Sequence, residues 1–293
     1  MKQLVVLSGK GGTGKTSVTA ALAHLAAREA PIVVADADVD AANLELVLQP
    51  TQVEEHAFIS GSLAVVDAAL CTTCGQCEEV CRFDAVVAGE ESYRIEPVAC
   101  EGCASCFHQC PVQAIRLEPR QSGQWYRSET PYGPLFHAHL FAGQENSGKL
   151  VTLVKQQARL WALDHKVGCL LVDGPPGIGC PVISASAGAD LALLVVEPTV
   201  SGVHDLQRIH ATTEHFRVPS AVLVNKADLN PRRAKEIKSF CSEHGVLIVG
   251  HVPFDTVVTE AMVQGQPVTA YADGLVSRAL QRVWRKLRGQ LIS

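Results

Sequence analysis

Apolar and polar residues follow one another along the chain in blocks that predict strands and helices in turn. Short apolar runs at residues 3–7 and 31–35 predict buried strands, and the first run leads into glycines. Between them, residues 16–28 carry apolar side chains at helical spacing. A strand, a helix and a second strand at this spacing form a βαβ unit, whose crossover is nearly always right-handed. The N-terminal segment therefore predicts the start of a parallel sheet.

The same alternation returns in the second half of the chain. Helices are expected at residues 149–164 and 275–287, and strands at residues 168–172, 191–196, 221–224 and 246–249. The strand segments are continuous runs rich in small and branched apolar residues, which is typical of parallel strands covered on both faces. We therefore predict an α/β fold with a mostly parallel, doubly wound sheet.

A cysteine-rich segment at residues 71–119 interrupts this pattern, and a polar segment containing aromatic residues follows at 123–148. Because the α/β alternation resumes afterwards, we expect the cysteine-rich segment to be an insert within one domain. The predicted organisation is a discontinuous α/β domain of residues 1–70 and 120–293, with a small inserted domain of residues 71–119.

Composition and charge narrow the class of protein. Hydrophobic residues make up 47% of the 293 residues, which is enough for a sizeable core. The formal net charge is −5, so we expect no nucleic-acid partner. No apolar run reaches the roughly 18 residues of a membrane span, and the first strand begins too early for a signal peptide to precede it. These features predict a cytoplasmic protein, in which eleven cysteines favour metal or redox chemistry over disulfides.

Residues 9–16 fit the phosphate-binding pattern G-x-x-x-x-G-K-[ST], between the first strand and the first helix. Glycines let the backbone N–H groups of such a loop surround phosphate oxygens, and the following helix adds the positive end of its dipole. Lys15 is expected to neutralise the β- and γ-phosphates, and the Thr16 hydroxyl to bind Mg²⁺. The predicted nucleotide-binding residues of this loop are Gly9, Lys10, Gly11, Gly12, Thr13, Gly14, Lys15, Thr16 and Ser17.

Two cysteine quartets recur 29 residues apart, each with the spacing C-x2-C-x2-C-x3-C. Bacterial two-cluster ferredoxins have this spacing, and in them the fourth cysteine of one quartet ligates the other cluster. We therefore expect a ferredoxin-like module with two [4Fe–4S] clusters. One cluster is assigned to Cys71, Cys74, Cys77 and Cys110, and the other to Cys100, Cys103, Cys106 and Cys81. Zinc is the main alternative because it also uses paired C-x2-C, but it would not need the full pattern twice.

The additional Lys10 makes the phosphate loop resemble the deviant Walker A of the MinD, ParA and nitrogenase iron-protein group. In that group two subunits face each other across nucleotide, and this lysine reaches the partner's phosphates and stabilises transition-state charge. The resemblance implies ATP or ADP with Mg²⁺ as cofactors, and catalytic roles for Lys10 and Lys15. It also implies a nucleotide-dependent homodimer or a heterodimer of paralogues.

Acidic segments after two strands resemble the switch elements of the same group. By this resemblance, Asp38 orients the attacking water and Asp36 lies near the Mg²⁺ shell. Asp173 would hold Mg²⁺ through water, and Gly177 would offer its N–H to the γ-phosphate.

The resemblance also covers the residues that would bind the adenine base, and it extends over nearly the whole chain. It implies that Asn225 binds the adenine edge and that Pro253 packs over the base, with ATP expected rather than GTP. The chain as a whole resembles MinD-superfamily P-loop ATPases containing an inserted ferredoxin domain. Other segments with patterns like theirs are residues 36–44, 145–149, 174–181 and 197–201.

Three cysteines and the histidines lie outside these motifs. Cys169 and Cys241 are expected to be core residues. Cys180 has the spacing from Asp173 at which the nitrogenase iron protein carries a cluster-bridging cysteine, but the second cysteine of such a site is missing. We therefore expect Cys180 to be structural. No histidines show ligand spacing, so none is assigned to a metal.

The leading hypothesis is an ATPase that couples nucleotide-dependent dimerisation to electron transfer, with a redox protein as its unidentified partner. One alternative is an iron–sulfur carrier or assembly ATPase like the Mrp-type proteins, although their lone C-P-x-C pair is absent here. Another is a positioning ATPase like MinD or ParA with a redox sensor module. MinD carries an amphipathic C-terminal membrane helix, whereas we expect the apolar stripe within residues 275–287 to pack in the core, without peripheral membrane contact.

Overall fold

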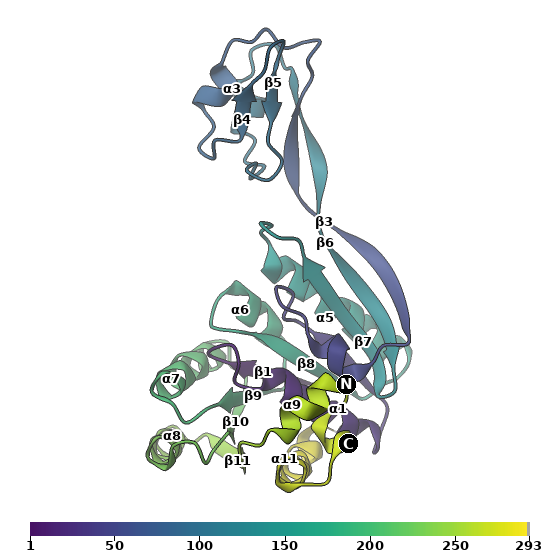
Figure 1. Ribbon diagram of the computed structural model, residues 1–293, viewed down its shortest axis with the longest axis vertical. Coiled ribbons are helices and arrows are strands. Elements are labelled where there is room, and N and C mark those ends of the chain that lie inside the picture. The colour runs from purple at the N-terminus through teal and green to yellow at the C-terminus, as the bar shows by residue number, and fades with distance from the viewer. Residues whose placement is uncertain (292–293) are drawn as a thin grey trace. The chain divides into compact units, whose positions relative to one another are not determined.

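The computed structural model describes residues 1–291, without the side chains of Gln52 and Val53 (Figure 1). The chain divides into two compact units. The first unit comprises Met1–His56, Trp125–His139 and the described residues from Ser147 onward, and the second comprises Ala57–Gln124 and Leu140–Asn146. The predicted insert of residues 71–119 lies within the second unit, which also takes in flanking residues on both sides.

A nine-stranded sheet forms the centre of the first unit, in the order β11-β10-β9-β1-β8-β2-β7-β6-β3. The pairs from β11 to β7 are parallel. The strands are β1 (Lys2–Ser8), β2 (Ile32–Asp36), β3 (Gln52–Val66), β6 (Ile115–Thr130), β7 (Gly133–Leu140), β8 (Cys169–Pro176), β9 (Leu191–Val196), β10 (Ser220–Asn225) and β11 (Leu247–Val252). The predicted α/β fold with a largely parallel sheet is therefore confirmed.

Helices cover both faces of this sheet (Figure 1). On β1, Leu4 and Val6 join one apolar core with α1, α10 and α11, whereas Val5 and Leu7 alternate to the opposite face. Helices α5, α6 and α7 also pack on the central strands. The helices are α1 (Lys15–Ala27), α2 (Leu44–Leu48), α5 (Ser147–Asp164), α6 (Cys180–Ser186), α7 (Val200–His215), α8 (Pro231–Glu243), α9 (Val257–Val263), α10 (Val268–Tyr271) and α11 (Leu275–Leu291).

The topology places a crevice at the carboxyl ends of the central strands. From β1 the chain crosses to β2, and β8 later fills the gap between them, while β9 pairs with the other edge of β1. Ligands of open α/β sheets bind at such reversals of strand order. The phosphate loop follows β1 directly and therefore lies at this point.

The apolar stripe of α11 is buried, as expected. Val276, Leu280, Val283 and Trp284 are each almost fully covered, whereas Leu275 at the start of the helix is exposed. Trp284 Nε1 also donates a hydrogen bond to Glu29 Oε1 over 3.1 Å. The stripe is thus part of the core of the first unit.

No helix within residues 1–291 is both long enough and apolar enough to cross a membrane.

The second unit contains little regular structure. It holds α3 (Gln76–Glu79), α4 (Ser105–Gln109) and an antiparallel pair, β4 (Val86–Ala88) with β5 (Tyr93–Ile95). Strands β3 and β6 belong partly to each unit. The 29-residue sequence repeat recurs in the backbone, because positive φ angles pair at that spacing: Thr73 with Gly102, Gly75 with Ala104, and Asp84 with Gln113. The two halves of the repeat therefore adopt the same local fold.

Candidate functional site

The phosphate loop is shaped by close approaches that require glycine. A Cβ on Gly9 would lie 2.3 Å from the Cβ of Asp205, and one on Gly14 would lie 2.5 Å from Nδ2 of Asn225. Gly14 also has a φ of 90°, which side chains disfavour, immediately before Lys15 begins α1. Glycine is therefore required at Gly9 by close packing, and at Gly14 by both close packing and backbone conformation.

A cavity of about 800 Å³ opens in front of this loop. The loop, the carboxyl ends of β8, β10 and β11, and residues of α2, α9 and α11 all contribute to its walls. Of the predicted nucleotide-site residues, those that line it are Gly11, Gly12, Gly14, Lys15, Thr16, Ser17, Asp38, Asn225 and Pro253. Its size and its mixture of polar and apolar walls suit a nucleotide.

Other predicted residues lie elsewhere. Gly9, Lys10 and Thr13 line a small separate pocket against α7. The N–H of Gly177 donates to the carbonyl of Ser8 over 3.0 Å, so in this conformation it is already paired. Asp36 and Asp173 lie buried behind the loop.

Asp36 and Asp173 are neighbours across β2 and β8. Asp173 accepts hydrogen bonds from the Thr16 hydroxyl at 2.7 Å and from the Thr19 hydroxyl at 2.8 Å. Burial raises the pKa of both carboxyls, and the charge of Asp173 raises the pKa of Asp36 further. Two buried carboxylates beside a hydroxyl are the hard oxygen donors that Mg²⁺ prefers, so these residues fit that ion.

Asp36 also organises the loop that follows β2. Its Oδ1 accepts the N–H of Asp38 at 3.0 Å, and its Oδ2 accepts those of Asn43 at 3.2 Å and Leu44 at 3.0 Å. These bonds tie residues 38–44, including the start of α2, to the carboxylate. A direct role for Asp36 in binding metal would compete with them.

Asp38 is half-buried at the wall of the cavity. Burial raises its pKa to about 6, and the charge of Lys15 opposes this rise. A carboxylate with a pKa close to neutrality is suited to accept a proton or to orient water.

Lys10 is held within its own chain. Its Nζ lies 3.4 Å from Oε2 of Glu197, and it donates to the hydroxyls of Thr199 at 3.3 Å and Ser201 at 3.1 Å. Lys226 forms a second ion pair with Glu197. The segment 197–201, which the sequence marked without giving it a role, therefore binds the lysine of the loop.

The ends of β10 and β11 form a further wall of the cavity. The side-chain amide of Asn225 donates from Nδ2 to the carbonyl of Thr13 over 2.8 Å, so it braces the loop. Asp228 accepts the N–H of Phe254 at 2.7 Å and holds the turn that carries Pro253. These contacts place Asn225 and Pro253 on one wall.

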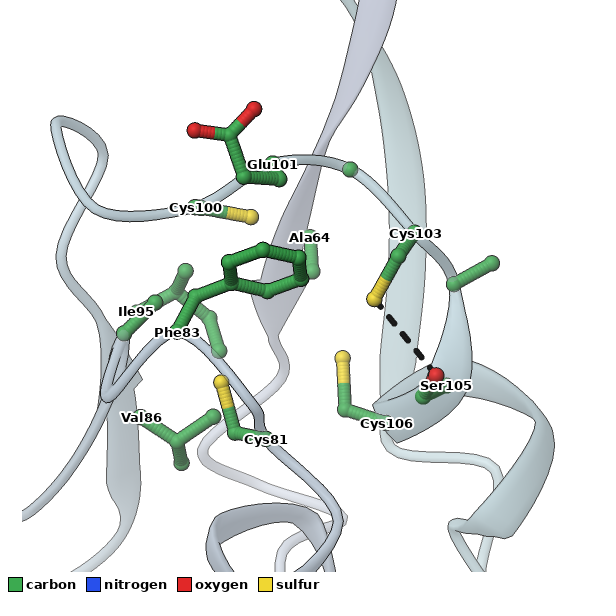
Figure 2. A pocket seen from close by; sticks show the side chains of 13 residues that line it. Ala64, Cys81, Phe83, Val86, Ile95, Cys100, Glu101, Cys103, Ser105 and Cys106 are labelled. Atoms are coloured by element: carbon green, nitrogen blue, oxygen red, sulfur yellow. Dashed lines mark hydrogen bonds between the residues drawn. The ribbon is translucent and has the colours of Figure 1, made fainter.

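In the second unit, the eight quartet cysteines gather into two sets of four. One pocket is lined by Cys81, Cys100, Cys103 and Cys106, and Figure 2 shows these four thiols around a common space with Phe83 beside them. A second pocket is lined by Cys71, Cys74, Cys77 and Cys110. Each pocket thus takes three thiols from one quartet and the fourth from the other.

The surroundings of the two sets differ in detail. Cys103 has a lowered pKa because the Ser105 hydroxyl lies 3.5 Å from its sulfur (Figure 2). Burial raises the pKa of Cys77 and of Cys106. None of the cysteines forms a disulfide within the described residues. Four converging thiols suit a soft metal or an iron–sulfur cluster.

The three remaining cysteines fall into two classes. Cys169 and Cys241 are buried, as expected of core residues, and burial raises their pKa values to about 12 and about 11. Cys180 is exposed at the first position of α6. This exposure does not suit the structural role predicted for Cys180, because an exposed thiol adds little to packing.

Two features were missed from the sequence. Lys155 is buried and donates to the carbonyls of Ser184, Ala185 and Ala187 over 2.6 to 2.8 Å, which ties α5 to the end of α6. Burial lowers the pKa of Lys155 to about 8. Nothing in its sequence neighbourhood distinguishes it from a surface lysine.

The second missed feature is a cluster of Glu45, His137 and His139. Burial lowers the pKa of His137 to about 4, so this imidazole is neutral at physiological pH. The signal was present in the sequence: two histidines at i and i+2 of a strand share one face. It was overlooked because β7 was not predicted as a strand.

Comparison with known proteins identifies a family whose pattern matches most of the chain. The family described as "CobQ/CobB/MinD/ParA nucleotide binding domain" matches residues 4–268. An uncharacterized protein of Methanocaldococcus jannaschii is 32% identical over 286 residues, covering 98% of this chain and 96% of that protein. An uncharacterized ATP-binding protein of the same organism is 26% identical, covering 98% and 87%.

Solved structures share the fold. The septum site-determining protein MinD of Pyrococcus horikoshii, complexed with Mg-ADP, matches with a TM-score of 0.59 at 17% identity, covering 98% of this chain and 95% of that one. MinD in a MinC:MinD complex of Aquifex aeolicus matches with a TM-score of 0.58 at 21% identity, covering 100% and 98%.

Proposed function

The chain belongs to the CobQ/CobB/MinD/ParA nucleotide-binding family, and from that premise we propose that it is a Mg-ATP-dependent ATPase coupled to electron transfer. Nucleotide binding and hydrolysis belong to the first unit. In the second unit, the eight quartet cysteines would hold two [4Fe–4S] clusters, which would supply electron transfer to or from a redox protein.

The role of each residue in ATP binding is inferred from its position around the cavity. Backbone N–H groups of the phosphate loop surround the phosphates, and Lys15 at the start of α1 neutralises their charge. The Thr16 hydroxyl and Asp173, which form a hydrogen bond of 2.7 Å in this conformation, would hold Mg²⁺. Asp38, at the cavity wall, orients the attacking water. Asn225 and Pro253 bind the base on the opposite wall.

Lys10 is the residue that links hydrolysis to a second subunit. Its contacts with Glu197, Thr199 and Ser201 lie within the same chain and are partly exposed to solvent. Lys10 can therefore exchange them for stronger contacts with phosphate. We expect ATP to draw Lys10 away from Glu197 and across to the nucleotide of a partner subunit.

The observation that carries the redox half of the proposal is the crossed grouping of the eight thiols, in which each pocket combines three cysteines of one quartet with the fourth cysteine of the other. The spacing of each quartet is that of two-cluster ferredoxins, in which the fourth ligand is exchanged between halves. The two pockets have that exchange. Structural zinc sites typically combine two C-x2-C pairs, whereas each pocket here takes three thiols from one quartet and one from the other. When bound, the clusters supply reversible one-electron transfer.

This chain's own residues tune such centres. Cys74 and Cys103, the second cysteine of each quartet, are exposed, so each pocket has one side accessible to a partner. The Ser105 hydroxyl lies 3.5 Å from the sulfur of Cys103, and polar groups beside the cluster sulfurs are among the features that set the potential of a cluster.

A second candidate is a positioning ATPase with a redox sensor module. Several relatives are septum site-determining MinD proteins, including that of Bacillus subtilis, 22% identical over 299 residues. The burial of the α11 stripe weighs against a membrane-binding helix of the MinD type. An iron–sulfur carrier is a third candidate, and it would release its clusters to an acceptor.

The proposal is tested by metal analysis of protein purified without oxygen. We expect about eight iron and eight sulfide per chain, with an electron paramagnetic resonance signal of reduced [4Fe–4S] clusters. Zinc in place of iron would overturn the redox proposal while leaving the ATPase standing. Transfer of the clusters to an apo-ferredoxin would favour the carrier.

A further inference from the structure

Glu45, His137 and His139 form a compact group in the first unit. Glu45 lies in the first turn of α2, and the two histidines lie on one face of β7. Oε2 of Glu45 is 3.1 Å from Nδ1 of His137, and Oε1 is 3.3 Å from Nε2 of His139. One donor atom from each residue lies within 4.8 Å of the others. Two imidazoles and a carboxylate are thus drawn together from separate elements.

One nitrogen of the buried His137 imidazole lacks a hydrogen-bond partner within the described residues. Its side chain is only 2% exposed, yet within the described part of the chain its Nδ1 has no hydrogen-bond partner. The nearby Glu45 oxygen is close enough for a hydrogen bond, so the pair fails on direction rather than on distance. Native proteins rarely leave such an atom unpaired, because its desolvation costs about 1–3 kcal/mol.

Ligands of one metal ion have this geometry. They point at a common third position rather than at each other, and donors about 2.0–2.1 Å from a tetrahedral ion lie about 3.3 Å apart. The separations of 3.1 and 3.3 Å, each from one imidazole nitrogen to a different oxygen of the Glu45 carboxylate, are close to that spacing. An ordinary ion pair would instead aim the N–H at the oxygen.

The surroundings hold the ligands in place. Nε2 of His137 is 3.0 Å from the Ser128 hydroxyl, which fixes the ring and leaves Nδ1 for the site. Tyr126 stacks on the His137 ring at 4.9 Å and meets the His139 ring edge to face. Metal-binding histidines typically have such a hydrogen bond on the other ring nitrogen.

We propose that Glu45, His137 and His139 bind a divalent transition-metal ion, with zinc or ferrous iron as the fitting class. Imidazole nitrogen suits these ions, whereas Mg²⁺ and Ca²⁺ require oxygen ligands. The side chains of His139 and Glu45 are 40% and 25% exposed, so a fourth position is open to water or a small ligand. Three protein ligands with one open position are typical of metal sites that do more than support a fold.

The ion would connect β7 to α2. Residue 44, next to the ligand Glu45, donates its N–H to Asp36, and Leu46 and Val47 of the same helix line the nucleotide cavity. A bound ion therefore restrains an element that borders the ATP site. It stabilises the folded chain by an amount that grows with the logarithm of the free metal concentration above the dissociation constant.

The test is a Co²⁺ titration of the full chain, purified anaerobically, without nucleotide. Bound cobalt is measured by equilibrium dialysis, and the thiolate-to-cobalt charge-transfer band reports any cobalt on cysteine. We expect one tightly bound Co²⁺ per chain without that band, and a rise in melting temperature. His139→Ala and Glu45→Gln, whose side chains are partly exposed, should each weaken this binding by at least about tenfold.

Matched variants decide the outcome. His165→Ala removes an exposed imidazole from the end of α5 and should bind cobalt like the wild type. Ser128→Ala should weaken binding by about tenfold through loss of the positioning hydrogen bond. Binding that is equally tight in wild type, His139→Ala and Glu45→Gln would overturn the proposal. So would a wild type that binds cobalt only through cysteine, or none at all.

Discussion

The two units are stabilised in different ways. The central strands of the first unit are fully covered, and its buried side chains include many leucines together with large aromatic ones such as Phe136 and Trp284. The core of the second unit is small: it combines Ala64, Ala85, Val86 and Ile115 with three of the quartet cysteines. Large apolar side chains such as Phe83, Val98 and Phe107 remain exposed there. The first unit can fold on apolar burial, whereas the second depends on what its thiols bind.

The units also differ in how they bury charge. In the first unit, Asp36, Asp173 and Lys155 are buried with several hydrogen-bond partners each. In the second unit, the buried reactive groups are the thiols of Cys77, Cys100 and Cys106, each of which lines a pocket with three other cysteines. This contrast can be tested with variants that remove one side-chain group from one unit. The property of the other unit, iron content or ATP binding, should then stay unchanged and serves as the internal reference.

The largest effect is expected from Lys15→Ala. The lysine is buried at the base of the phosphate loop, so its loss removes the main positive charge facing the phosphates. We expect ATP hydrolysis to fall by about 10³-fold and nucleotide affinity to be lost. Iron content should not change, because no quartet cysteine is touched.

Steady-state ATPase assays and isothermal titration with ATP measure this effect. Lys235→Ala, on the exposed face of α8, is the control and should behave as the wild type. Normal ATP affinity in Lys15→Ala would mean that the loop is not the phosphate site.

Asp38→Ala should have the next largest effect. If Asp38 orients water, hydrolysis falls by about 10²-fold while ATP still binds. Single-turnover kinetics with radiolabelled ATP separate the two steps. Asp40→Ala, an exposed neighbour at the same cavity, should lose much less activity. Equal turnover in Asp38→Ala and wild type would remove Asp38 from the mechanism.

Lys155→Met tests the buried charge of the first unit. Removing the ammonium leaves the carbonyls of Ser184, Ala185 and Ala187 without their donor. We expect a loss of about 2–3 kcal/mol in the free energy of unfolding of the first unit. Urea unfolding followed by tryptophan fluorescence measures it. Lys149→Met, exposed on the same helix, should cost much less, and equal stability of both variants would show that these contacts contribute nothing.

Cys106→Ser should remove about half of the iron, a twofold effect. The substitution takes one thiol from the pocket of Cys81, Cys100 and Cys103 and leaves the other pocket intact. ATP binding by the first unit should persist. Iron analysis together with ATP titration checks both statements. Cys180→Ser is the matched control, and a loss of iron in that variant would point to a cluster site that includes Cys180.

The sequence predicted the parts of the molecule whose signals are local. The run of residues 3–7, the glycine loop and the helix after it are adjacent in sequence and in space, and they appear as β1 and α1. The crossed grouping of the thiols was predicted because the spacing within each quartet leaves the fourth cysteine for the other site.

Other parts depend on distant partners and were missed. Strand β6 has an irregular burial pattern along its length, so no period of two was visible, and β3 and β7 lie beside it in the sheet. His137 and Glu45 are 92 residues apart in sequence, and only the position of β7 brings them together. Lys155 is buried because α6 ends beside it, which composition does not reveal. Cys180 was expected to be structural because the second cysteine of a cluster-bridging site is missing from the sequence, yet it is exposed at the start of α6.

The most direct test of the account is whether nucleotide in one unit changes electron transfer in the other. Anaerobic stopped-flow absorption would follow reduction of an artificial acceptor by the dithionite-reduced chain, with ATP, with ADP and without nucleotide. The account predicts that ATP changes the rate by about tenfold, and that Lys15→Ala abolishes this dependence while retaining its iron. Identical rates under all three conditions, in a chain with full iron content, would contradict it.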